Sequence, residues 1–367
     1  MFHKIINTLF IIFAFLSLGT QNLVASEKKH VNVLNWAEGI PQNILKEFEA
    51  ETGIQVHYDV YDSAELMEAK LLTGDSGYDV VGVTVWPYLD RQIQTGIYQP
   101  LNKTSLRNYA HLDADLLKKM STADPKNQFG IPYLWGTTGI GLNVSKVEKL
   151  LPDQNLSTWA LLFDPEIAKD LNACGLELID SPVDVFSAIL AYLGKDPNSD
   201  NLEDLKFASQ NVMKVRHYIF KFHGTQGMQD LLNGEACVVQ GWSGEMLQAR
   251  ERAREIGGDE IDYVIPQEGS NLWIDAFAVP QNAPHIQEAH QLIDFLLRPE
   301  IIARISNALF TANAIPNSKK FMDQDIVKDP VIYPSKEVRK RLFVDKIHPP
   351  QFERSRSREW IRVKTGQ

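Results

Sequence analysis

Three pairs of tryptophan and acidic side chains are the residues of this chain best suited to binding chemistry. Two pairs come at the ends of predicted strands, Trp36 with Glu38 and Trp242 with Glu245, and the third, Trp273 with Asp275, lies inside one. The face of an indole ring attracts organic cations, and a carboxylate accepts charge-assisted hydrogen bonds from an ammonium group. A pocket lined by both groups would select an aliphatic chain that ends in an amine.

Asp275 has the clearest need for a positively charged partner. It lies in NLWIDAFAVP (271–280), a short apolar run closed by proline that predicts a buried strand. Trp273 would project to the same side of that strand. No basic residue lies between Ser270 and Pro284, so a partner must come from elsewhere in the fold or from a ligand. The alternative is that Asp275 caps a turn beside a core tryptophan.

Motifs for catalysis, phosphate binding and metal binding are missing. The GIG at 139–141 lacks the third glycine of a phosphate loop, and GWSGE (241–245) has a glutamate where a nucleophile elbow needs glycine. The nine histidines show no zinc-ligand spacing. We therefore expect no cofactor, no metal and no enzymatic activity. The alternative is an exported hydrolase or metal enzyme that uses the acids as acid and base groups.

The N-terminus predicts an exported protein. Lys4, the apolar run 9–18 and the small residues before Ser26 are typical of a signal peptide spanning residues 1–25. The chain of 367 residues is long enough for two domains. Its net charge of −10 argues against nucleic acid as the main partner. The basic C-terminal run from Arg354 to Lys364 is interpreted as the solvated face of a helix.

Two cysteines in an exported chain favour one disulfide, and the alternative is a pair of buried free thiols. A bond between Cys174 and Cys237 would close a loop of about 63 residues and stabilise the fold by roughly 4 kcal/mol.

Strands and helices alternate through the first third of the chain. Strands are predicted at 31–36, 54–62 and 78–83, with helices at 40–51 and 64–73 between them, which indicates a mainly parallel α/β sheet. Ligands bind beyond the carboxyl ends of such strands, here at 36–39 and 84–86. The uncharged, glycine-containing segment 129–144 and the run 271–280 are interpreted as two crossings between lobes. Residues 145–257 are predicted to be mainly helical, with a strand at 235–241.

Several sequence blocks, from about residue 31 to the C-terminus, resemble the periplasmic polyamine-binding proteins of bacterial ABC importers. These blocks include VNVLNWAEG, ETGIQVHYDVYDS, PYLWGTTGIGLN, LLNGEACVVQGWSGE, IPQEGSNLWIDAFAVP and TANAIP. The resemblance implies an α/β fold of the two-lobed periplasmic binding protein type (type II, Venus-flytrap), with a mainly parallel sheet in each lobe and two or more hinge crossings. We expect a first lobe of residues 26–135 and 275–320, and a second of residues 136–274 and 321–367.

The resemblance also implies a function and a set of ligand-binding residues. The protein would be a monomeric periplasmic receptor that binds putrescine, spermidine or a related polyamine and delivers it to an inner-membrane ABC permease. The implied binding residues are Trp36, Glu38, Thr84, Asp184, Trp242, Glu245, Trp273, Asp275 and Thr311. Asp184 enters only through the resemblance, because by itself it reads as a helix N-terminal acid favoured by the dipole. Cys174 and Cys237 match positions that are disulfide-bonded in close relatives.

The chain departs from the family's motifs at several of these positions. Hydroxyl and aromatic side chains are replaced by Ala37, Gly39 and Thr311, and the longer third-strand loop carries Thr84, Val85 and Trp86. These changes predict a roomier pocket, and with it a preference for a longer or bulkier amine or weak binding of putrescine. A receptor for another amine-containing metabolite is the alternative.

Overall fold

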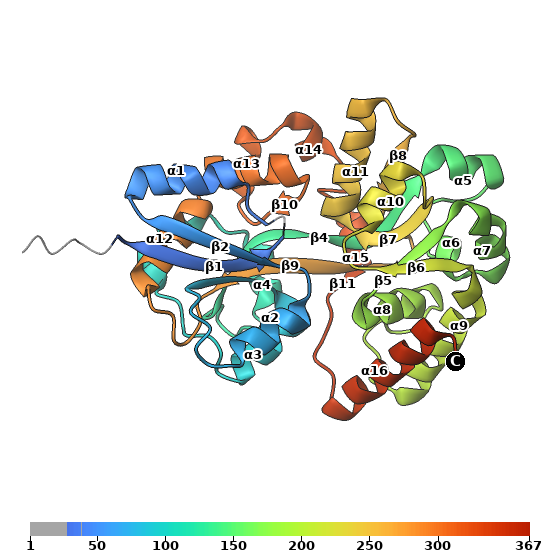
Figure 1. Cartoon of the computed structure of the whole chain (residues 1–367), viewed down its shortest axis with the longest axis horizontal. Coiled ribbons are helices and arrows are strands. Elements are labelled where there is room, and N and C mark those ends of the chain that lie inside the picture. The colour runs from blue at the N-terminus through green and yellow to red at the C-terminus, as the bar shows by residue number, and fades with distance from the viewer. Residues whose placement is uncertain (1–27, 38) are drawn as a thin grey trace, which may run out of the picture.

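The computed structural model describes residues 28–37 and 39–367 (Figure 1). The predicted signal peptide and Glu38 lie outside the described residues. Within the described part of the chain, no helix has both the length and the apolar character needed to cross a membrane.

One mixed sheet runs through the whole molecule, with the strand order β2-β1-β3-β9-β4-β7-β5-β6. Its strands are β1 (His30–Trp36), β2 (Gln55–Tyr61), β3 (Val80–Thr84), β4 (Gly130–Asn143), β5 (Leu176–Ile179), β6 (Ile219–His223), β7 (Val238–Trp242) and β9 (Ser270–Ala278), joined by the short strands β8 (Ile261–Val264), β10 (Ala312–Asn313) and β11 (Leu342–Phe343). Strand β1 pairs in parallel with β2 and β3, and β5 pairs in parallel with β6 and β7. Every antiparallel pairing between two of these strands involves β4 or β9, and an isolated antiparallel bridge joins Tyr98 to Pro280.

The helices divide into two groups around this sheet (Figure 1). Around β1–β3, in what we call the first lobe, lie α1 (Gln42–Thr52), α2 (Ala64–Leu71), α3 (Asp90–Gln94), α4 (Ala114–Met120), α12 (Ile286–Leu296) and α13 (Pro299–Leu309). Around β5–β7, in the second lobe, lie α5 (Val144–Leu150), α6 (Ala160–Phe163), α7 (Pro165–Leu171), α8 (Pro182–Tyr192), α9 (Leu202–Val215), α10 (Gly227–Asn233), α11 (Ser243–Ile256) and α16 (Pro350–Thr365). Helices α14 (Gln324–Lys328) and α15 (Lys336–Lys340) lie between the two groups. The lobe boundaries given above stay a prediction.

Strands β4 and β9 connect the lobes, which confirms the two predicted crossings. The first part of β4 pairs with β9 from Gly130, opposite Ala278, to Thr137, opposite Leu272. The second part of β4, from Thr138 onward, pairs with β7 of the second lobe. Strand β9 pairs in turn with β3 of the first lobe. Both segments are therefore shared between the lobes, as a hinged clamp requires.

The prediction that residues 145–257 are mainly helical is confirmed, but two features of the second lobe were not predicted. Strands β5 and β6 lie in the region predicted to be mainly helical. β5 is only four residues long and buried on both faces, so its sequence shows no strand alternation. The C-terminal basic run is not wholly solvated, because Arg356 is 7% exposed beside Trp360 in the seam where α16 packs on α8 and α9.

The predicted disulfide between Cys174 and Cys237 is confirmed, with the two Cα atoms 5.4 Å apart. It fastens the segment that precedes β5 to the start of β7, and the Cys237 side chain is completely buried. The bond therefore supports the strand whose other end carries Trp242.

Candidate functional site

Three of the predicted site residues meet at the first-lobe end of the crossing strands. Trp36 is the last residue of β1, Thr84 is the last residue of β3, and Asp275 lies opposite Thr84 in the register of β3 with β9. The Thr84 hydroxyl donates a hydrogen bond of 2.6 Å to Oδ1 of Asp275. The site therefore lies at the carboxyl ends of parallel strands, as the sequence predicts.

Asp275 has hydrogen-bond donors but no cationic partner. Burial raises the pKa of its carboxyl to about 6. Hydrogen bonds from the hydroxyl of Thr84 and the indole of Trp36 oppose part of this rise in pKa. None of the ion pairs among the described residues involves Asp275. An ammonium group of a ligand would stabilise a desolvated carboxylate that has no ion-pair partner in the protein.

Strand β9 presents Asn271, Trp273 and Asp275 on one face. Trp273 and Asp275 are partly accessible, whereas Ile274 between them is fully buried on the other side. This burial pattern agrees with the shared side predicted for Trp273 and Asp275. Four residues of extended strand separate the Cα atoms of Asn271 and Asp275 by about 13 Å. The face is thus an acid at one end, an indole in the middle and an amide at the other end.

Gly136 makes room for the Trp273 indole. The two residues are opposite each other where β4 pairs with β9. A Cβ atom at position 136 would lie 2.3 Å from Cζ2 of Trp273, which is closer than any side chain allows. A glycine of the first crossing therefore fixes the position of the aromatic wall on the second crossing.

Asp184 lies at the second-lobe end of the site. It belongs to the first turn of α8, where Ser181 caps the helix and Pro182 starts it. Its side chain is 8% exposed and accepts a hydrogen bond of 2.8 Å from the Thr138 hydroxyl. Burial raises the pKa of Asp184, and the hydrogen-bond donors around it, including those of Asn271 and Trp242, lower it. Asp184 is thus a helix N-terminal acid that also lies near Asn271 of β9 and Trp242 of β7.

The remaining predicted residues differ in what they contribute. Trp242 ends β7 opposite Thr138 and lies beside Asp184. Glu245 is partly buried in the first turn of α11. Thr311 is 5% exposed, and its hydroxyl donates to the Leu309 carbonyl oxygen at 2.9 Å. That hydroxyl lies against Gly244, where a Cβ atom would be only 2.6 Å away.

The extra room predicted from the family departures is absent at two positions. A Cβ atom at Gly39 would lie 2.3 Å from Nδ2 of Asn35, so the buried Asn35 side chain fills the space beside this glycine. Thr311 is packed against the start of α11, as described above. Trp86 is 5% exposed within a large apolar cluster that contains the first-lobe core and extends along the crossing strands into the second lobe. Neither position borders open space on the side described here, and the preference for a longer amine stays a prediction.

Several residues around the site have no sequence motif. Tyr88 donates a hydrogen bond of 2.8 Å to Glu65, and burial together with the charges of Glu65 and Asp184 raises its pKa well above the usual value. Asn271 could have been found by counting two residues back from Trp273 along the strand. Asp345 has no such signal, because only the fold brings it to Asn271.

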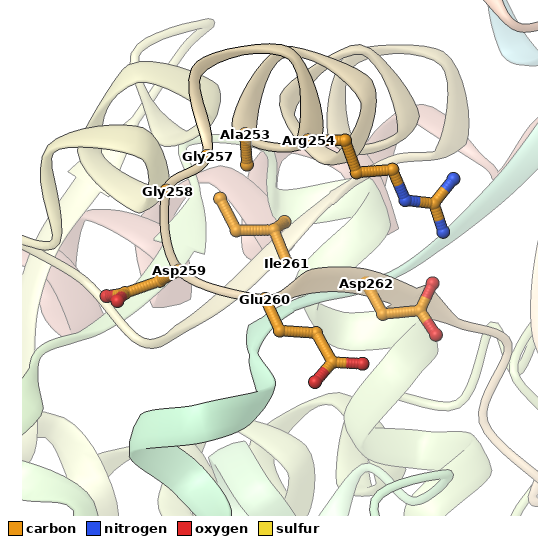
Figure 2. A pocket seen from close by; sticks show the side chains of 8 residues that line it. All are labelled: Ala253, Arg254, Gly257, Gly258, Asp259, Glu260, Ile261 and Asp262. Carbon is orange, nitrogen blue, oxygen red and sulfur yellow. The ribbon is translucent and has the colours of Figure 1, made fainter.

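A surface hollow of about 370 Å³ lies at the far end of α11, away from these residues (Figure 2). Two of its three acids have partners, since Asp259 accepts from Asn143 at 2.8 Å and Asp262 accepts from Arg250 at 3.4 Å. Among the residues that the structure describes, no group of three or more His, Cys, Asp or Glu side chains could hold a metal ion. The interlobe face is therefore the better candidate site.

A two-lobed sheet with two shared strands, and with acids and tryptophans where the lobes meet, defines a solute-binding protein of the clamp type. Residues 43–334 match the model of the bacterial extracellular solute-binding protein family, and the chain belongs to that family. It is 41% identical to the putrescine-binding periplasmic protein PotF of Escherichia coli, over 95% of this chain and 94% of PotF. It is 42% identical to a putrescine/agmatine-binding protein of Pseudomonas aeruginosa, over 92% of each chain.

A solved structure agrees with this assignment. The putative spermidine/putrescine ABC transporter protein of Listeria monocytogenes superposes with a TM-score of 0.82 at 28% identity. The match covers 92% of this chain and 100% of that protein. The fold class expected from the sequence, a two-lobed periplasmic binding protein, is confirmed.

Proposed function

We propose that this protein is a periplasmic receptor that binds a polyamine between its lobes and delivers it to an ABC permease of the inner membrane. The observation that carries the proposal is the face of β9, where the partly accessible carboxylate of Asp275, without an ion pair among the described residues, lies beside the partly accessible indole of Trp273. Asp275 would bind one ammonium group, with Thr84 holding the carboxylate in place. Trp273 would pack on the methylene groups, and Asp184 would bind the second ammonium group.

Closure follows from the position of these groups in the two lobes. Asp275 pairs with β3 of the first lobe, whereas Asp184 is on α8 of the second lobe. An amine that contacts both acids does so only when the lobes are together, so its binding energy favours the closed arrangement. The named relatives bind putrescine, agmatine or spermidine, which supports the same ligand class here. We propose a binding function and no catalytic one.

Isothermal titration of unfolded and refolded protein, which carries no ligand from the host cell, tests this proposal. Putrescine, cadaverine, spermidine and spermine are titrated in parallel with lysine and γ-aminobutyrate, which carry a carboxylate as well as an amine. We expect saturable binding of at least one polyamine and none of the two zwitterions, because a ligand carboxylate would meet buried acids. Tight binding of a zwitterion, with no binding of any polyamine, would favour a receptor for another amine-containing metabolite.

A further inference from the structure

Asp345 reaches the interlobe site through the segment between β11 and α16. Strand β11 pairs in parallel with the beginning of β9, and Phe343 lies opposite Asn271. Two residues later, Asp345 accepts a hydrogen bond of 2.8 Å from Nδ2 of Asn271. Figure 1 shows this segment leaving the middle of the sheet and running to the start of α16. The C-terminal part of the chain thus brings a carboxylate to the end of the face that Asn271, Trp273 and Asp275 form.

Asp345 and Asp184 are two buried acids that share one amide. Asp345 is 6% exposed and Asp184 is 8% exposed. The Asn271 side chain bonds to Asp345 and also lowers the pKa of Asp184. Burial, and then the charge of Asp184, raises the pKa of Asp345 to about 7. Two carboxylates this close cannot both ionise without a large electrostatic cost, unless positive charge lies near them.

The protein does not supply enough positive charge to this pair. Arg356 lowers the pKa of Asp345 from a distance, but its guanidinium bonds to Glu353 at 2.7 Å. Burial and the charge of Arg356 lower the pKa of His348 to about 4, so this imidazole is neutral at pH 7. No ion pair among the described residues involves Asp184 or Asp345.

We propose that Asp345 is an additional carboxylate of the binding site, and that Asp184, Asn271 and Asp345 form a subsite that prefers a triamine to a diamine. This inference rests on the proposed function and adds the substrate class to it. A diamine held at Asp275 brings one ammonium group to the pair, and the second negative charge stays uncompensated. A triamine brings a secondary ammonium as well, so both carboxylates can be neutralised.

The space behind Asp345 limits the ligand at this end. A cavity of about 20 Å³ lies beyond it, lined by Asp345, His348, Arg356 and residues of α8 and α16. A space of this size holds about one water molecule and no further methylene chain. The terminal ammonium group of the ligand therefore stops at the Asp184 and Asp345 pair. Charge at Asp345, and not open room at Gly39 or Thr311, selects the longer amine.

The test compares the affinities of wild type and Asp345→Asn for spermidine and putrescine by isothermal titration at pH 8, where Asp345 is ionised. Asparagine keeps an oxygen that can accept from Asn271 and removes the charge, while its NH₂ group replaces the second carboxylate oxygen. We expect the affinity for spermidine to fall by about 10-fold or more, and that for putrescine to change by less than about 3-fold. Asp153→Asn, at an exposed loop position of the second lobe, is the matched control and should change neither affinity.

Thermal melting of the ligand-free variant checks its folding, and Asp345→Ser replaces it if asparagine does not fold. An equal loss for both amines, or no loss for either, would overturn the inference while leaving the receptor function in place. Tighter binding of putrescine than of spermidine by the wild-type protein would also overturn the inference and leave the receptor function in place. If wild type binds neither amine, the proposed function fails, and this inference fails with it.

Discussion

Asp275→Asn should weaken polyamine binding and at the same time stabilise the ligand-free protein. The carboxylate is ionised at pH 8 although burial raises its pKa from 3.8 to about 6. A shift of about two units corresponds to about 3 kcal/mol of unfavourable free energy in the folded state. Asparagine removes this cost, and its side-chain oxygen can still accept the hydrogen bond of Thr84. If the new amide N–H group finds no acceptor, the variant loses about 1–3 kcal/mol of this gain in stability.

The pH dependence separates this effect from a general change in packing. An acid whose pKa is raised on folding lowers stability above its folded pKa, and the penalty disappears when both states are protonated below about pH 4. For Asp275 the penalty is about 1–2 kcal/mol at pH 5 and about 3 kcal/mol at pH 8. The unfolding free energy of Asp275→Asn relative to wild type should therefore increase by roughly 1 kcal/mol over this interval.

Urea unfolding of the ligand-free proteins at pH 5 and pH 8 measures this difference, and titration with a polyamine at pH 8 measures the affinity. Removing one partner of a desolvated ion pair should cost about 3 kcal/mol of binding, or roughly 100-fold in Kd. Asp75→Asn, at an exposed loop position, is the control and should change neither quantity. An unchanged Kd would show that Asp275 is not the ammonium anchor. A relative stability that does not depend on pH would refute the electrostatic reasoning.

Three further predictions follow from the same structure. Gly136→Ala should displace the Trp273 indole and weaken amine binding by about 10-fold or more. Titration measures the affinity, and circular dichroism checks that the fold is intact. Unchanged affinity would mean that the indole is not a wall of the site. The affinity of the wild-type protein for the amine should fall as the pH drops below about 6, because protonated Asp275 has no charge. Amine binding near pH 6 should therefore release protons, which titration in buffers of different ionisation enthalpy detects. Replacing both Cys174 and Cys237 by serine should lower the unfolding free energy by about 4 kcal/mol in urea, and a loss below about 1 kcal/mol would contradict the role assigned to the disulfide.

The first-lobe part of the site could be predicted from local sequence patterns. Strands β1 and β3 alternate with helices in the order of a parallel sheet, so Trp36 and Thr84 were expected at its carboxyl edge. The run around Asp275 combines apolar burial with a missing basic neighbour, and the structure shows the corresponding acid without a cationic partner. In each case, a few consecutive residues are enough to predict where the site residue lies.

The second-lobe part depends on contacts between distant segments, which a single sequence does not display. Asp184 resembles an ordinary helix N-terminal acid until α8 packs against β4 and Thr138 bonds to it. Asp345 is 74 residues from Asn271, and only the pairing of β11 with β9 brings them together. Gly39 suggested open space because the sequence could not show the Asn35 side chain beside it.

A crystal structure of the protein with bound spermidine would test the central claim most directly. We predict one ammonium nitrogen within about 3 Å of the Asp275 carboxylate, the methylene groups against the Trp273 indole, and another ammonium nitrogen at the pair of Asp184 and Asp345. Spermidine bound elsewhere, for example in the acidic hollow at the end of α11, with Asp275 untouched, would contradict the account.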